Sequence, residues 1–207
     1  MDTQINTLEQ LGSLQSVEEI CWTLLHGGAS SRKSAMHQAS IATAVDGMAL
    51  MRTVVLRRVD MDGKRLFLHT DLRSKKMNDF ERGDSLSWLF YDQSVATQIR
   101  LSGKVILHHQ DSLCREHWDK TGHHSRRYYM SETAPSVAFD EPFTGLNPAL
   151  TSFAYTLEES EMGLANFVVV ETEISWMEWY FTHHTGNRRA VFRYTEGFLK
   201  EASWLSP

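Results

Sequence analysis

The sequence predicts a mostly β protein with a few flanking helices, built as a barrel rather than as an open sheet. Two Asp-Gly pairs, Asp46-Gly47 and Asp62-Gly63, separate short runs in which apolar and polar residues alternate. This pattern is typical of strands joined by tight hairpin turns. The chain also closes with a pair of strand-like runs. Several short antiparallel strands with few helices favour a closed barrel.

The length and composition fit one globular domain. The chain has 207 residues, 42% of them hydrophobic and 23% charged, and we predict a single domain spanning residues 1–207. The net charge of -5 argues against a general nucleic-acid-binding protein, which usually carries a basic excess. Local basic pairs such as Arg126-Arg127 are explained equally well by a small phosphate ligand.

The sequence also indicates a cytoplasmic protein without a membrane segment. Cys21 and Cys114 are the only two cysteines, and reduced thiols are their expected state. The polar N-terminus lacks the basic and apolar regions of a secretory signal. No run approaches the roughly 18 consecutive apolar residues that a membrane-spanning helix requires.

The first part of the chain predicts one amphipathic helix. Residues 1–15 are polar, and we expect them to be loosely ordered. Ser16, with Glu19 three residues later, has the pattern of a capping box at a helix start. The pair Gly27-Gly28 is expected to end this helix.

The expected strands follow the alternating runs, and two Asp-Gly turns should join the first three into a meander. The strands are predicted at 38–45, 50–59, 65–69, 85–91, 98–107, 166–172, 174–180, 190–194 and 198–205. A short helix ending at Gly83 and a second helix over 111–120 are also expected. Residues 121–160 contain three of the four prolines and predict an irregular insertion, a kind of segment that often carries function.

Three cations stand out beside the predicted hairpins. Arg52 begins one strand, and Lys75 and Lys76 follow the end of the next. A hairpin can bring such positions together around one small anion, which suggests a phosphate site. Spacing alone favours the simpler reading of solvent-exposed charges, because lysine side chains are mostly exposed.

A family resemblance favours the phosphate site over the reading of solvent-exposed charges. The strings RTVVLR, LFLHTDLRSKK, WLFY and QIRLSGKV, in this order, resemble the FMN-binding split β-barrel of the pyridoxamine 5'-phosphate oxidase family. The segment MEWYFTHHTGNRRAVFRY is similar to the last segment of that family. The resemblance covers residues 38–110 and 165–205. It implies a split barrel, a homodimer with FMN between the subunits, and FMN-dependent oxidoreductase activity.

The resemblance also assigns residues to the cofactor. It implies phosphate contacts from Arg52, Lys75 and Lys76, and a contact of Gln98 with the polar edge of the flavin ring. Trp179 and Arg189 would come from the second subunit, and Ser136 could add a phosphate contact across the dimer. The full set is Arg52, Thr53, Val54, Val55, His69, Thr70, Ser74, Lys75, Lys76, Gln98, Trp179 and Arg189.

The chain departs from the family where the substrate should bind. Arg57 stands in place of a lysine that holds the substrate phosphate, and the family's Arg-Leu-His motif falls on Thr185, Gly186 and Asn187. We therefore expect that FMN binding is retained and that pyridoxal-type substrate recognition is lost. Arg57 and Asn187 are candidate substrate residues. A new position for the lost charge would be Arg126, Arg127 or Arg188.

Other chemistries receive less support. A flavin-binding carrier or sensor without turnover is the main alternative, and related split barrels also use haem or a deazaflavin. Cys114, His117, His123 and His124 lie close in sequence but lack the second matched ligand pair of a structural zinc site, so no metal is predicted. The absence of a Gly-x-Ser-x-Gly motif argues against a serine hydrolase of that type.

Overall fold

The computed structural model describes residues 12–207. Most of the segment 1–15, predicted to be loosely ordered, therefore lies outside the described residues. Leu14 and Gln15 belong to the first described helix. None of the helices in residues 12–207 combines the length and the hydrophobicity that a membrane span requires.

The described residues cluster into two compact units. The first unit contains the described residues up to Leu68 together with Arg82–Ile106 and Glu171–Pro207. The second contains His69–Glu81 and Leu107–Val170. The single domain predicted from the sequence stays a prediction.

Helix α2, Leu14–Ser30, begins earlier and ends later than its sequence predicts. Its N-cap is Ser13, whose hydroxyl accepts a hydrogen bond from the backbone N–H of Ser16, so the prediction of Ser16 as N-cap is wrong by one turn. The helix also continues through Gly27-Gly28. A Cβ on Gly28 would lie 2.5 Å from the carbonyl oxygen of Met36, so this glycine permits close packing rather than ending the helix.

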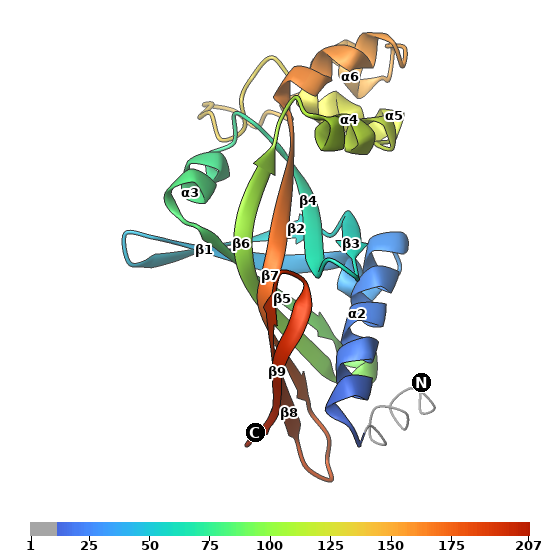
Figure 1. Ribbon diagram of the computed structural model, residues 1–207. Helices are drawn as coiled ribbons and strands as arrows, with labels where there is room; N and C mark the ends of the chain where they lie inside the picture. The colour runs from blue at the N-terminus through green and yellow to red at the C-terminus, as the bar shows by residue number, and fades with distance from the viewer. Residues whose placement is uncertain (1–11) are drawn as a thin grey trace. The chain divides into compact units, whose positions relative to one another are not determined.

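Helix α2 belongs to the first unit (Figure 1), where it makes aromatic and charged contacts. Trp22 donates its indole N–H to the hydroxyl of Tyr194 over 3.1 Å. The ammonium of Lys64 lies 3.1 Å from Glu18 and 4.9 Å from the centre of the Trp22 ring. Burial, with a smaller effect of Glu18, raises the pKa of the Cys21 thiol, which makes this cysteine unreactive at neutral pH.

Nine strands form one sheet. They are β1 Gln38–Val45, β2 Met48–Val55, β3 Arg58–Asp60, β4 Arg65–Asp71, β5 Ser85–Asp92, β6 Thr97–His108, β7 Phe167–Phe181, β8 Arg188–Thr195 and β9 Phe198–Leu205. The order along the sheet is β2-β1-β5-β6-β7-β4-β3, and β8 pairs with β7 and β9. The predicted hairpin turn at Asp46-Gly47 is confirmed: both residues have positive φ, 50° and 79°, as a type I′ turn requires.

The predicted three-strand meander is wrong. Strands β2 and β3 are separate, because Leu56 and Arg57 interrupt them, and they lie at opposite ends of the strand order. The backbone N–H of Leu56 bonds to the carbonyl of His37, and the N–H of Arg57 bonds to the carbonyl of Phe67. The partner of Leu56 thus directly precedes β1, and the partner of Arg57 lies on β4, near the other end of the strand order.

Strand β7 is one 15-residue strand, where two strands are predicted from the sequence. It continues through Glu173. A Cβ on Gly103 of β6 would lie 2.0 Å from the Glu173 carbonyl oxygen. Gly103 therefore allows the backbones of the two strands to approach closely at this point, an effect that local sequence does not reveal.

The second unit contains the short helices and the irregular segment predicted for 121–160. Its helices are α3 Lys76–Arg82, α4 Ser112–Asp119, α5 His123–Arg126 and α6 Pro148–Thr151, with 3-10 turns η3 Arg127–Tyr129 and η4 Glu159–Asn166. Buried Arg126 bonds to Glu161 over 2.7 Å and lies over the Trp118 ring. Burial acts to raise the pKa of Glu161, but hydrogen bonds from Arg115, Trp118 and Arg126 outweigh it and hold this pKa below its ordinary value.

Candidate functional site

The second unit contains a cavity of about 400 Å³. This volume lies in the range typical of small-molecule sites. The lining combines polar side chains with several aromatic ones. It consists of Thr70, Asp71, Lys76, Tyr128, Tyr129, Ser131, Thr133, Ala134, Pro135, Ser136, Val137, Phe139, Phe143, Thr144, Gly145 and Leu146.

Two of the predicted cofactor residues meet in this cavity: Lys76, expected at the phosphate, and Thr70, expected at the ribityl chain and ring. Lys76, at the start of α3, donates from its ammonium to the hydroxyl of buried Thr70 over 2.9 Å. Ser74 is buried nearby in sequence but does not line the cavity, and Lys75 is exposed. An ammonium beside a hydroxyl is the kind of donor pair that binds phosphate oxygens.

Of the predicted pair His69 and Thr70, only Thr70 lines the cavity. Asp71, which follows Thr70 at the end of β4, lines the cavity as well, so this division does not follow from the alternation of strand residues. The ring of His69 instead makes a 2.8 Å hydrogen bond to the ring of buried His117 and packs on Phe167, with ring centres 4.7 Å apart.

An ion pair between Arg73 and Asp71 lies at the polar side of the cavity. Arg73 makes two hydrogen bonds to the Asp71 carboxylate, of 3.0 and 2.7 Å, and a third of 2.7 Å to the carbonyl of Ser131. The hydrogen bonds from Asp71, against the smaller opposing effect of burial, raise the pKa of Arg73 above its ordinary value. The Asp71 charge is thus neutralised inside the site.

The segment 131–146 forms a loop that is closed at its base. The Ser131 hydroxyl donates to the carbonyl of Gly145, which joins the two ends of the segment. Ser136, predicted as a phosphate contact across the dimer, has a φ of 71° in this loop and lines the same cavity as Thr70 and Lys76 of its own chain. A non-glycine residue at positive φ is uncommon and often accompanies a ligand site.

The first unit holds the other predicted cofactor residues. Arg52 on β2 bonds to the Thr43 hydroxyl over 2.7 Å and to the Leu50 carbonyl over 2.8 Å. Directly paired residues share a face of a sheet, and Arg52 pairs with Ile41, whereas Thr53 pairs with Ser40.

The four predicted β2 residues therefore divide into two pairs, Arg52 with Val54 and Thr53 with Val55. Through Ser40, Leu89 and Arg100, the pairing places Thr53 and Gln98 on one face of the sheet. Thr53 and Val55 therefore share their face of the sheet with Gln98, whereas Arg52 and Val54 point to the other face.

Trp179 and Arg189, the two cofactor residues predicted in the C-terminal segment, have contrasting environments. Trp179 is 0% exposed and packs on Phe181, so it offers no surface to a ligand held by another subunit. Arg189 is part-exposed and donates from Nε and Nη2 to buried Glu178 over 2.9 and 2.6 Å. Arg100 approaches the other oxygen of Glu178 at 3.4 Å.

The two candidate substrate residues lie between strands, Arg57 between β2 and β3 and Asn187 between β7 and β8. The Arg57 side chain is exposed. Asn187 donates to the Tyr180 hydroxyl over 2.8 Å and accepts from the His183 backbone N–H, which stabilises the turn between β7 and β8. Within residues 12–207, no three His, Cys, Asp or Glu side chains gather in a way that could hold a metal ion.

Sequence reasoning missed several residues that build the cavity. Asp71 and Arg73 belong to the quoted string LFLHTDLRSKK, but their pairing required the end geometry of β4. The aromatic residues of the loop had only one signal, the prolines that mark 121–160 as a long irregular segment.

Comparison with known proteins places the chain in a family. Residues 4–109, just over half of the chain, match the family described as pyridoxamine 5'-phosphate oxidase, FMN-binding domain. The chain belongs to this family. The resemblance noted in the sequence and the split-barrel fold that it implies are thereby confirmed. No curated protein matches the chain.

Two solved structures have the same fold over nearly the whole chain. One is a pyridoxamine 5'-phosphate oxidase-related, FMN-binding protein from Nostoc punctiforme, with 17% identity, a TM-score of 0.65, and coverage of 89% of this chain and 94% of that one. The other is PhzG from Burkholderia lata in complex with tetrahydrophenazine-1-carboxylic acid, with 18% identity, a TM-score of 0.68, and coverage of 96% and 95%.

Proposed function

We propose that the protein binds FMN and acts as an FMN-dependent oxidoreductase. The observation that carries the proposal is the pair Lys76 and Thr70, which point into a cavity of ligand size in a member of an FMN-binding family. In this proposal Lys76 and Thr70 hold the phosphate of the cofactor.

The residues of the cavity fit a phosphate ester. Such a phosphate carries close to two negative charges, and each charge-assisted hydrogen bond to it contributes roughly 1.5–3 kcal/mol. The Lys76 ammonium and the hydroxyls of Thr70 and Ser136 supply donors of this kind. Arg73 neutralises Asp71, so the one acidic side chain in the lining does not repel the phosphate.

The remaining cofactor assignments stay predictions drawn from the resemblance. They include the phosphate contacts of Arg52 and Lys75 and the contact of Gln98, whose amide offers both a donor and an acceptor to a flavin edge. Arg189, held by Glu178, is proposed to act from the second subunit of a homodimer.

The cofactor would supply the redox chemistry, while the protein supplies binding, orientation and polarity. The family to which the chain belongs is named for an oxidase, which favours an enzyme over a carrier. An enzyme will transfer electrons between an added donor and oxygen or a second acceptor much faster than an equal concentration of free FMN does. A carrier will be no faster than free FMN with any such pair.

Replacing Lys76 tests the proposed phosphate position. We expect purified protein to be yellow with bound flavin, and Lys76→Ala to weaken FMN affinity by about ten- to a hundredfold, as the loss of one charge-assisted hydrogen bond implies. The measurement is titration of FMN into FMN-free protein, followed by quenching of flavin fluorescence.

Lys120→Ala is the matched control. Lys120 is an exposed lysine of the same unit, paired with Glu116, and does not line the cavity. Equal FMN affinity in the Lys76 variant and the Lys120 variant would show that the phosphate lies elsewhere. A colourless protein that takes up no added FMN would refute the proposed cofactor.

A further inference from the structure

The first unit holds a further cavity, of about 210 Å³, on its sheet. Its lining includes one cation, Arg100 of β6, and apolar surface from Trp176 of β7 and Met51 of β2. Three hydroxyl groups also line it, from Ser40, Ser87 and Ser102. The volume lies below the range typical of drug-sized ligands, so this cavity suits a small molecule.

The positive charge of Arg100 is only partly compensated. The buried carboxylate of Glu178 already accepts hydrogen bonds of 2.9 and 2.6 Å from Arg189. The Nε of Arg100 lies 3.4 Å from the other oxygen of Glu178, a longer contact. Two guanidinium groups thus share one carboxylate, and the three side chains together carry one net positive charge.

Arg100 is oriented by its neighbours and still has donors for a ligand. Its guanidinium lies over the Trp176 ring, 5.3 Å from the ring centre, and its side chain is 46% exposed. In the described part of the chain, the structure shows no hydrogen bond from its two Nη groups. A planar guanidinium binds a carboxylate through two parallel N–H···O bonds.

The serine hydroxyls provide further donors beside this guanidinium. Ser87 pairs directly with Ser102 across β5 and β6, and their hydroxyl oxygens are 2.9 Å apart. One O–H is used in that bond, which leaves the other O–H of the pair as a donor. A carboxylate carries one negative charge and matches the single surplus charge at Arg100. A phosphate ester, with close to two charges, matches it less well.

The pocket lies next to the residues assigned to the flavin ring. Gln98, expected at the polar edge of the ring, precedes Arg100 by two positions on the same face of β6, about 7 Å along the strand. Met51 places the pocket beside the surface that the proposed homodimer would bury, and the resemblance places FMN between the subunits. A molecule held at Arg100 would therefore lie within reach of the ring.

We infer that this pocket binds a small molecule with one carboxylate group, held by Arg100, and that this is the substrate class of the proposed oxidoreductase. The inference rests on the proposed function, because it needs the flavin ring at Gln98. An anchor on β6 also lets the protein orient a substrate without the family's lysine and Arg-Leu-His motif, whose positions hold Arg57 and residues 185–187.

Benzoate and benzamide, which share one ring and differ in charge, test the inference. In FMN-loaded protein, benzoate will bind at least about tenfold more tightly than benzamide, because only benzoate forms charge-assisted bonds with Arg100. Arg100→Gln will weaken benzoate binding by about tenfold. Binding is measured by NMR titration. The visible absorbance of the flavin is recorded in the same samples and will shift as benzoate fills the pocket.

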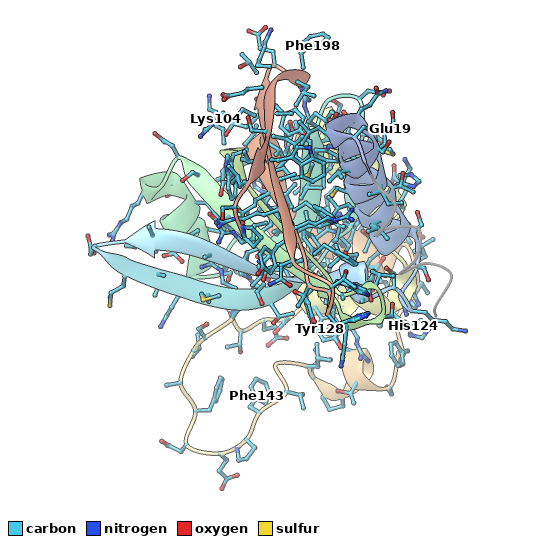
Figure 2. The ribbon with its side chains drawn as sticks, turned by 90° about the horizontal axis from the view of Figure 1, so that it is seen from below. Glu19, Lys104, His124, Tyr128, Phe143 and Phe198 are labelled. Carbon is cyan, nitrogen blue, oxygen red and sulfur yellow. The ribbon has the colours of Figure 1, made fainter. Side chains whose placement is uncertain are left out.

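The controls separate the guanidinium contact from general charge. Lys104, labelled in Figure 2, is an exposed cation on the same face of β6 and does not line the pocket. Lys104→Gln will bind benzoate as the unaltered protein does, and Arg100→Lys, which keeps the charge without the planar fork, will bind it with intermediate affinity. Urea unfolding confirms that each variant is folded. Equal affinity for benzoate and benzamide, unchanged binding in Arg100→Gln, or displacement of FMN by benzoate would overturn the inference.

The same titrations in FMN-free protein distinguish this inference from the proposed cofactor. Benzoate binding will depend on Arg100 there as well, because the anchor belongs to the protein. If the protein takes up no FMN, the proposed function fails, and the loss of benzoate binding in Arg100→Gln still identifies the carboxylate site. If FMN binds and benzoate fills the pocket without changing the flavin spectrum, the substrate inference alone fails.

Discussion

At the scale of single residues, side-chain direction decides which predicted site residues can act together. His69 and Thr70 are neighbours on β4, yet only Thr70 lines the cavity. The contact that holds the His69 ring, a hydrogen bond to the ring of His117, is not evident from the sequence. Neither is the burial of Trp179, which depends on packing against Phe181 and Trp204 in the fold.

The contacts of Arg189 with Glu178 lead to a prediction about stability. Arg189→Lys will lower the free energy of unfolding by about 1 kcal/mol, because a lysine cannot reproduce the two N–H contacts with buried Glu178. The measurement is urea unfolding of FMN-free protein, which excludes any effect through the cofactor.

The same strand provides the control for Arg189. Arg193 also pairs with a carboxylate, Glu201, but both side chains are more than half exposed. Exposed ion pairs contribute little, so Arg193→Lys will leave the unfolding midpoint nearly unchanged. Equal losses in the two lysine variants would mean that Glu178 does not hold Arg189 as described.

At the scale of elements, the sequence predicts those turns, strands and helices that depend on interactions between residues close in sequence. The Asp46-Gly47 turn, the strands that flank it and helix α4, with Asp111 as N-cap, all follow from short-range rules. The end of α2 and the course of β7 do not, since Gly28 and Gly103 serve close contacts with distant backbone at Met36 and Glu173. The sequence alone does not reveal whether a glycine ends a helix or strand or allows two elements to pack closely.

The two adjacent glycines of α2 give an element-scale prediction. A Cβ on Gly27 meets nothing within 4 Å, whereas one on Gly28 would lie 2.5 Å from the Met36 carbonyl oxygen. Gly27→Ala will stabilise the protein by about 0.5–1 kcal/mol, the helix-propensity difference. Gly28→Ala will destabilise it, because backbone must move. Thermal unfolding of both variants checks this, and a rise in melting temperature for Gly28→Ala would contradict the packing explanation.

At the scale of the whole molecule, the exposed apolar residues of β2 support the proposed homodimer. Among the described strands, β2 pairs with β1 alone, and Met48 and Met51 on it are 62% and 63% exposed. Exposed apolar residues on an edge strand favour association. The family resemblance also predicts this dimer.

Sedimentation of point variants tests the dimer. We expect the unaltered protein to sediment as a dimer and Met51→Glu to shift it toward the monomer, because a charge would be buried at the contact. Met162→Glu is the matched control, since Met162 is a methionine of the other unit with 65% exposure. A monomeric unaltered protein at micromolar concentration would refute the dimer.

The closed base of the loop 131–146 has a consequence for how such proteins diversify. Since Ser131 bonds to Gly145 and Arg73 fixes the Ser131 carbonyl, residues near the tip, such as Phe139 and Phe143, can change without disturbing the strands. We therefore expect that replacing the tip of this loop with that of a relative will transfer the relative's ligand preference, while the fold and the binding of the cofactor stay the same. Selection for new chemistry can act on this segment at little cost to folding.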